Sequence, residues 1–315
     1  MILALVVPST AGDPMSDQRW LNCRLVDIQQ QLAPHGISVS KPVISRILRH
    51  HGYTLRANVK QAAGKQHPDR DCQFQYIARQ RQQAGATAQP IISVDTKKKE
   101  LIGNFKNAGR IWCPAAEVVN QHDVRHDAVG VAVPYGIYDI QHNCGTVYVG
   151  QSADTPAFAV GNIAHWCATE LRERYPDAHH LWIVADSGGS NGARSRAWKY
   201  HLQVQVADTL GLTVTVCHYP PGTSKWNPIE HRLFSEISKT WAGCPLRSFA
   251  QMRDYLKATT TQTGLRVRAH LVTTTYRTGE KITNAAMAAL TIQFHDVCPQ
   301  WNYTIHPRSP DTLEH

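Results

Sequence analysis

The 315-residue sequence lacks the long apolar stretch that would cross a membrane and the motifs that commonly hold zinc. Its opening apolar run, Met1 to Val7, is too short to span a bilayer and has neither the basic flank nor the cleavage site of a secretory signal. Its eight cysteines form no C-x-x-C pair and its 17 histidines no H-E-x-x-H motif. These absences argue against a zinc ribbon and a secreted disulfide scaffold, and we expect a cytoplasmic protein with reduced thiols.

Positive charge, by contrast, is plentiful and unevenly distributed along the chain. The formal net charge is +9, and the first 90 residues carry 11 Lys and Arg against 5 Asp and Glu, so six of the nine positive charges lie there. A basic segment of this kind indicates a polyanionic partner, most often nucleic acid. A solvated basic face without a partner is the alternative.

Residues 1–88 are predicted to form a helix-turn-helix or winged-helix-like DNA-binding region. Apolar spacing predicts helices over 24–32 and 41–51, separated by the Pro-His-Gly break at 34–36. Arg46 and Arg49 would point outward from the second helix, as a helix that reads the major groove requires. Residues 52–60 could form a basic β wing. The alternative is a helical hairpin with a structural role only.

Residues 89–245 alternate between buried strands and amphipathic helices, after a small, polar linker that ends near residue 88. This pattern predicts a mixed five-stranded sheet flanked by helices, with the element order of a ribonuclease H-like fold. We interpret residues 246–315 as a C-terminal extension packed on this core. The predicted strands cover 90–96, 131–140, 145–152, 180–186 and 213–220, and the helices 156–175, 194–210 and 227–241.

Three acids stand at strand ends or at a helix start in these elements. Asp95 ends the first strand, Asp186 ends the fourth, and Glu230 lies in the first turn of the helix after the fifth. Carboxylates brought together in this way suit two Mg²⁺ or Mn²⁺ ions about 3.5–4 Å apart, which activate a nucleophile and stabilise the leaving oxygen of a phosphodiester. Each acid also has a structural alternative, because Asp95 could start a turn, Asp186 could cap a loop and Glu230 could stabilise its helix through the dipole.

The neighbours of these acids suggest supporting roles. Asn227 is placed to cap the helix that carries Glu230, and His231 could contact the scissile phosphate or orient a ligand. Trp226 could stack on a displaced base or pack under its loop. The candidates for contacts with backbone phosphates are Lys97, Lys98, Lys106 and Lys225.

With these residues in view, the chain resembles a DDE transposase of the ISAzo-thirteen insertion-sequence family over nearly its whole length. The motif NPIE at 227–230 also resembles the motif around the last acid of mariner-type transposases, which favours Glu230 over Glu236. The stretches that carry the resemblance are GKQHPDRD (64–71), ISVDTKKKELIGNFKNAGR (92–110), VPYGIYD (133–139), ADSGGSNG (185–192), CHYPPGTSKWNPIEHRLF (217–234), ATTTQTGLRVRAHL (258–271) and WNYTI (301–305).

The resemblance implies a ribonuclease H-like core in which Asp95, Asp186 and Glu230 are the catalytic, metal-binding triad. It further implies Mg²⁺ or Mn²⁺ as cofactor, terminal inverted repeats and target DNA as partners, and action as a homo-oligomer on DNA at the bacterial nucleoid. Ser187 and Pro228 depart from the family pattern, which has Ala and Lys there, but neither change removes a ligand.

Two functional interpretations remain open from the sequence. The first is a metal-dependent transposase that hydrolyses phosphodiester bonds and transfers strands at insertion-sequence ends. The second is a DNA-binding protein with an inactive ribonuclease H-like domain, as in a decayed copy. Family members usually carry a further helical DNA-binding segment, and MILALVVPSTAGDP at 1–14 resembles the end of one, so an N-terminally truncated copy is part of the second interpretation.

Overall fold

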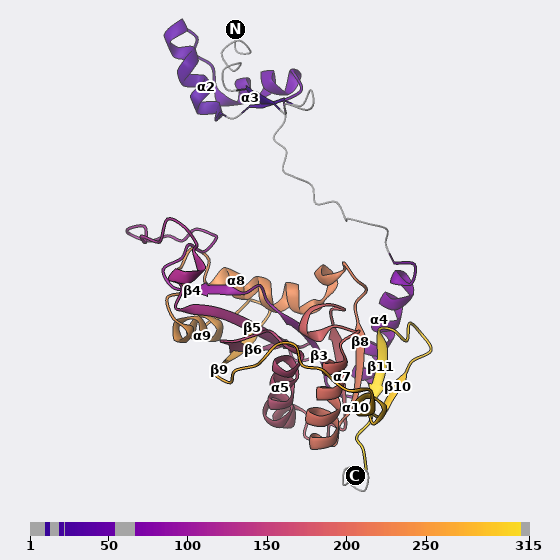
Figure 1. Ribbon diagram of the computed structural model, residues 1–315. Coiled ribbons are helices and arrows are strands. Elements are labelled where there is room, and N and C mark those ends of the chain that lie inside the picture. Colours follow the sequence, from indigo (N-terminus) through magenta and orange to yellow (C-terminus); the bar gives the residue numbers. More distant parts are fainter. Residues whose placement is uncertain (1–9, 13–18, 22, 54–66, 310–315) are drawn as a thin grey trace. The chain divides into compact units, whose positions relative to one another are not determined.

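The computed structural model describes residues 10–12, 19–21, 23–53 and 67–309 (Figure 1). The chain divides into two compact units, Met1–Ala63 and Gly64–His315, which we describe separately. Among the described residues, no helix combines the length and the apolar composition needed to cross a membrane.

The first unit contains the two helices that the sequence predicts, packed on each other through a small apolar core. Ile28 and Leu32 of the first helix are buried against Ile44 and Leu48 of the second. Gly36, with a φ of 72°, makes the turn between them. The predicted wing lies outside the described residues from position 54 onward. The elements are β1 (Thr10–Gly12), which pairs antiparallel with β2 (Arg19–Leu21), α2 (Leu25–Leu32), η2 (Ala33–His35) and α3 (Lys41–His50).

The second unit is built around one mixed sheet whose centre is the predicted five-stranded arrangement. The order along the sheet is β10-β11-β8-β7-β3-β5-β6-β9, and β4 pairs with β5 off this path. Its central segment, β6-β5-β3-β7-β8, has the strand order and directions of a ribonuclease H-like fold, which confirms the predicted fold class. The strands are β3 (Ile91–Thr96), β4 (Glu100–Ile102), β5 (Gly130–Asp139), β6 (Cys144–Gly150), β7 (His180–Ala185), β8 (Thr213–His218), β9 (Arg266–Val272), β10 (Ile292–Phe294) and β11 (Asn302–Ile305).

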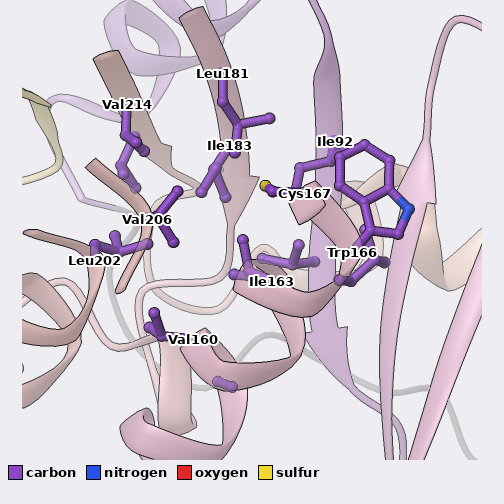
Figure 2. Packing of buried hydrophobic residues seen from close by; sticks show 14 of the residues in the cluster. Ile92, Val160, Ile163, Trp166, Cys167, Leu181, Ile183, Leu202, Val206 and Val214 are labelled. Carbon is purple, nitrogen blue, oxygen red and sulfur yellow. The ribbon is translucent and has the colours of Figure 1, made fainter. Parts of the chain in front are cut away.

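Helices cover both faces of this sheet. Figure 2 shows the packing on one face, where Trp166 and its neighbours on the helix at 156–166 lie on Ile92, Leu181 and Ile183 of the strands. Burying each large apolar side chain contributes about 1.5–3 kcal/mol. The helices and helical turns are α4 (Arg70–Ala86), η3 (Arg125–Asp127), α5 (Pro156–Trp166), η4 (Cys167–Leu171), α6 (Arg172–Arg174), η5 (Gly189–Asn191), α7 (Arg196–His201), η6 (Leu202–Asp208), η7 (Ser224–Trp226), η8 (Glu230–Phe234), α8 (Ser235–Thr240), α9 (Phe249–Lys257) and α10 (Asn284–Ala288).

The division between the units lies at 63/64, whereas the sequence placed the boundary near 88. The difference is α4, which the sequence assigned to the N-terminal region. Ile77 and Ala84 of α4 are buried in a cluster with Trp182 of β7. Gln73 of α4 exchanges hydrogen bonds with Asn302 of β11. The helix therefore belongs to the second unit.

Residues 246–315 contribute to the sheet itself rather than only packing on it. β9 extends one edge as a parallel neighbour of β6, and β11 extends the other as an antiparallel neighbour of β8. All four residues of β11 are buried, which is why the motif WNYTI reads as apolar and aromatic. With β10 from this segment and β4 from residues 100–102, the predicted five strands become nine.

Strand direction decides which side chains meet at the edge of the sheet. β3, β7 and β8 are mutually parallel, and β6 also runs in the direction of β3 because each is antiparallel to β5. The carboxyl ends of these four strands therefore lie at one edge. That edge carries Asp95 and Asp186.

The helix that carries Glu230 approaches β5 and β6 closely because two strand positions are glycine. A Cβ atom at Gly136 would lie 2.5 Å from Phe234 and 2.8 Å from Ile229, and one at Gly145 would lie 2.4 Å from Leu233. All three helix residues are buried, so they have little room to move aside. These glycines set the distance between the sheet and η8.

We expect Gly136→Ala to destabilise the protein by about 1–3 kcal/mol, because the added methyl group overpacks a filled core. Urea unfolding followed by circular dichroism measures this change. Gly85→Ala is the matched control: the residue is exposed in α4, and a Cβ there meets no atom within 4 Å. The control should be neutral or stabilising by up to ~1 kcal/mol, and equal destabilisation by both changes would contradict the packing argument.

Candidate active site

Asp95 and Asp186 line one open pocket at the carboxyl edge of the sheet. Asp95 lies within β3, and Asp186 directly follows β7, its parallel neighbour. The pocket has a volume of about 390 Å³, and Asp154 and the glycine loop at 188–189 also line it. The structure thus brings together two of the three acids that the sequence singled out.

Burial and mutual repulsion disfavour the charged forms of these acids. Burial, followed by the nearby carboxylate of Asp186, raises the pKa of Asp95 to about 8, although the backbone N–H of Thr96 donates to it at 2.7 Å. Glu230 and Asp154 add further repulsion at Asp95. In the described chain no cationic side chain forms an ion pair with Asp95 or Asp186.

Glu230 is the third member of this electrostatic group. Burial raises the pKa of Glu230, while His231 and Lys97 oppose the shift. Burial and Glu230 in turn raise the pKa of Asp186, against a hydrogen bond from Asn227. Glu230 is half-buried at the start of η8 and is not among the residues that line the pocket.

The three carboxylates fit a hard divalent cation by their chemistry. Oxygen donors of this kind bind Mg²⁺ or Mn²⁺, and a cation between them would relieve the repulsion that raises their pKa values. Within the described ranges, however, no three His, Cys, Asp or Glu side chains are close enough to hold one ion together. Asp95 and Asp186 line the same pocket, whereas Glu230 does not.

Asn227 connects all the elements that present the acids, although not as the predicted helix cap. Its buried side-chain amide donates to the Asp186 carboxylate at 3.1 Å and to the Val94 carbonyl at 3.3 Å. Its Oδ1 accepts a hydrogen bond from the Ser93 hydroxyl. The Ser93 hydroxyl in turn accepts from the backbone N–H of Ile229 at 3.1 Å, so a residue from β3 satisfies a free N–H of the helix start.

The predicted phosphate-binding lysines differ in how accessible their ammonium groups are to an external phosphate. Lys97 is largely buried, with Nζ 2.6 Å from Glu100 Oε1 and 5.0 Å from the centre of the Trp241 ring. Lys98 is exposed at the rim of the acidic pocket. Lys106 is exposed beside a neighbouring pocket of about 440 Å³. The structure therefore leaves Lys98 and Lys106 free for an external anion.

Lys225 and Trp226 lie on the turn η7 before η8, and His231 lies within η8. Trp226 is 52% exposed and meets Phe74 edge-on, and the Lys225 ammonium lies 5.5 Å from the centre of the indole ring. His231 Nε2 hydrogen-bonds to the Lys225 carbonyl. About half of the Trp226 side chain thus stays accessible to solvent. In the first unit, Arg46 and Arg49 are both exposed on α3.

Sequence analysis missed Ser93 and Asp154. Asp154 accepts a hydrogen bond from the Thr96 hydroxyl at 3.1 Å and lines the same pocket as Asp95. Its position just after β6 was a usable signal, because the third strand of this fold runs parallel to the first. Ser93 gave no such signal, since its role depends on which helix packs on β3.

Comparison with known proteins shows which family the chain matches. The family described as "Rhodopirellula transposase DDE domain" matches residues 1–307. No protein of curated function matches the sequence. Among solved structures, a pre-cleavage Mos1 transpososome is 15% identical with a TM-score of 0.48, covering 82% of this chain and 69% of that chain. A Mos1 transposase paired-end complex with the left transposon end is 14% identical with a TM-score of 0.46, covering 78% and 73%.

The burial of Asp95 and the repulsion from neighbouring acids predict that Asp95→Asn stabilises the protein in the absence of divalent ions. Folded Asp95 keeps its proton up to about pH 8, whereas its usual pKa is 3.8, so the folded state binds more protons between these values and stability falls as pH rises. The amide retains the acceptor for the Thr96 N–H but carries no charge.

Urea unfolding in EDTA at pH 5 and pH 8 measures this effect. The gain in the free energy of unfolding from Asp95→Asn should be larger at pH 8 than at pH 5. In thermal unfolding, each kcal/mol of this gain would raise Tm by roughly 2–4 °C. Asp177→Asn, at an exposed position, is the matched control and should change stability little at either pH. A gain that does not grow with pH would show that the charge of Asp95 is not what destabilises the site.

Proposed function

The chain belongs to the DDE-domain transposase family, and from this premise we propose that Asp95, Asp186 and Glu230 are its catalytic carboxylates. The observation that carries the proposal is their electrostatic coupling: burial raises the pKa of all three, and repulsion from neighbouring acids adds to the shift at Asp95 and Asp186. Coupled acids with perturbed pKa values are typical of catalytic sites.

The reaction we propose is the hydrolysis and transfer of phosphodiester bonds at the ends of an insertion sequence. Water or a 3′-hydroxyl attacks the phosphorus atom, and the bond to the leaving oxygen breaks as the new P–O bond forms. Asp95 and Asp186 would hold Mg²⁺ or Mn²⁺, with Glu230 completing the ligand set for a second ion. When bound, two such ions polarise the phosphate and neutralise the charge that develops on the entering and leaving oxygens.

The chain's own residues prepare this site. Asn227 orients the Asp186 carboxylate through its amide and is itself fixed by Ser93 and the Val94 carbonyl. Lys98 and Lys106 would contact backbone phosphates near the scissile bond, and Trp226 offers an exposed ring face on which an unpaired base could stack.

The partner we propose is DNA, both the terminal inverted repeats and the target. In the first unit, α3 exposes Arg46 and Arg49 on the side opposite its buried residues Ile44 and Leu48, which suits a helix that docks in the major groove. We further propose that the protein acts on DNA as a homo-oligomer. The alternative of an inactive DNA-binding protein is not favoured, because the three acids and the residues that support them are all present.

Metal-dependent cleavage of an oligonucleotide that carries the element's end tests the catalytic assignment. Asp186→Asn should lower the cleavage rate by at least about 100-fold, because it removes a proposed metal ligand. Glu236→Gln is the matched control, six residues beyond Glu230 on α8 and paired with Lys239 at the surface, and should cleave normally.

A second readout separates metal binding from chemistry. Mg²⁺ should raise the thermal midpoint of the wild type and of Glu236→Gln, since an ion that binds only the folded state stabilises it. Asp186→Asn should lose most of this shift. Equal cleavage by wild type and Asp186→Asn would refute the three-carboxylate assignment.

For the first unit, replacing Arg46 and Arg49 by Glu should weaken DNA binding and flatten its salt dependence. Each lost phosphate contact on a duplex reduces the slope of log K against log salt by about 0.9. The same charge reversal at Arg253 and Lys257 on α9 is the control. An unchanged slope in the Arg46/Arg49 variant would assign α3 a structural role.

A further inference from the structure

An irregular segment after β9 carries one arginine and one lysine side chain that the proposed site does not use. Residues 273–283, which we name the strap, join β9 to α10 without forming a helix or strand. In Figure 1 this segment passes across α5 toward α7 and α10. Arg277 and Lys281 are both exposed on it.

The strap is held firmly despite its lack of regular structure. The backbone N–H of Tyr276 donates to the Ser152 hydroxyl at 3.1 Å, and the Tyr276 ring packs edge-on against Phe158 of α5, with centroids 5.4 Å apart. Farther along, Glu280 lies 2.8 Å from His201 of α7. Anchors on two helices fix the positions at which the strap presents its cations.

The two cations of the strap form no ion pair with a described residue. In the described part of the chain, neither Arg277 nor Lys281 has an acidic partner within ion-pair distance. Arg196 on α7 faces the strap and bonds only to neutral groups, the Asn284 side chain at 2.7 Å and the Ile282 carbonyl at 3.4 Å. These three cations and two carboxylates, those of Asp154 and Glu280, line one pocket of about 500 Å³, which we name the strap pocket.

The strap pocket adjoins the acidic pocket. Asp154 lines both, and it lies beside Asp95 in the second. Lys98 and Lys99 also line the acidic pocket, and they line the pocket that contains Lys106. Two pockets with cationic side chains thus adjoin the acidic pocket, as a polyanion requires when one of its charges lies at the acids.

We propose that the strap pocket binds the sugar-phosphate backbone of the DNA strand that continues from the scissile phosphate, with Arg277 and Lys281 contacting successive phosphates. This inference rests on the proposed function, because it takes the acidic pocket as the place of the scissile bond. Arg196, oriented by Asn284, supplies a third charge at the base of the strap. Exposed ammonium and guanidinium groups neutralise phosphates without reading sequence.

Arg277→Gln/Lys281→Gln tests the proposal in the full-length protein, with the same end oligonucleotide as above. We expect the slope of log K against log salt for DNA binding to become shallower by roughly 1.8, the contribution of two phosphate contacts. Arg253→Gln/Lys257→Gln removes the same charge from α9, which packs in the apolar cluster on the opposite face of the sheet from α5, and should leave the slope unchanged. The Arg277→Lys/Lys281→Arg variant keeps both charges and should have the wild-type salt slope.

Methylphosphonate substitution locates the contact. Uncharged phosphates placed singly on either side of the scissile bond should slow single-turnover cleavage by the wild type at one or two positions. At those same positions the Arg277→Gln/Lys281→Gln variant should show no further loss, because the contact is already gone. Thermal unfolding checks that the exposed changes leave the fold intact.

Two assays, end cleavage and strand transfer, identify which DNA the strap contacts. A defect in end cleavage assigns the strap to the element end, and a defect only in strand transfer from a pre-cut end assigns it to the target. An unchanged slope together with unchanged methylphosphonate sensitivity would overturn the strap proposal while wild-type cleavage continues. Absence of cleavage by the wild type with Mg²⁺ or Mn²⁺ would instead refute the proposed function.

Discussion

The site depends on one buried amide, that of Asn227. Its side chain reaches the Asp186 carboxylate, the Val94 carbonyl and the Ser93 hydroxyl, so it joins the loop after β7, the strand β3 and the start of the helix that carries Glu230. Asn227 is fully buried, and a polar group left unsatisfied there would cost about 1–3 kcal/mol. The amide therefore has one favourable arrangement, and that arrangement fixes the relative positions of the elements that carry the acids.

Around this amide, packing and electrostatics oppose each other. Gly136 and Gly145 allow η8 to lie close to the sheet, and the buried side chains of Ile229, Leu233 and Phe234 fill the interface. The acids are also withdrawn from water, and this burial, together with repulsion from the neighbouring acids, raises the pKa of Asp95 to about 8. The apolar core stabilises a charge distribution that is unfavourable by itself, an arrangement common at functional sites.

The C-terminal quarter of the chain extends this site instead of merely covering the core. β11 lies beside β8 and places Tyr303 Oη 3.2 Å from His218 Nε2, while His218 Nδ1 lies 2.9 Å from the Asp186 carbonyl. Burial lowers the pKa of His218 to about 4, so this link holds a neutral imidazole at physiological pH. From the other edge of the sheet, β9 leads into the strap and its exposed cations. Both ends of the extension thus reach the neighbourhood of the acids.

The sequence by itself indicated the central strands, their order and the three candidate acids, because each strand is a nearly continuous apolar run. Asp95 and Asp186 stand at or just beyond strand ends, and Glu230 stands in the first turn of a helix. The sequence also indicated the helix pair of the first unit through apolar spacing around a Pro-His-Gly break. Only the tertiary structure decided where α4 packs, that β9, β10 and β11 extend the sheet, and that Ser93 rather than Asn227 accepts the free N–H of the helix start. These features depend on contacts between residues far apart in the chain, such as Ser93 with Ile229 and Gln73 with Asn302. Local periodicity carries no information about such pairs, since it records which face of an element is buried and not which element buries it.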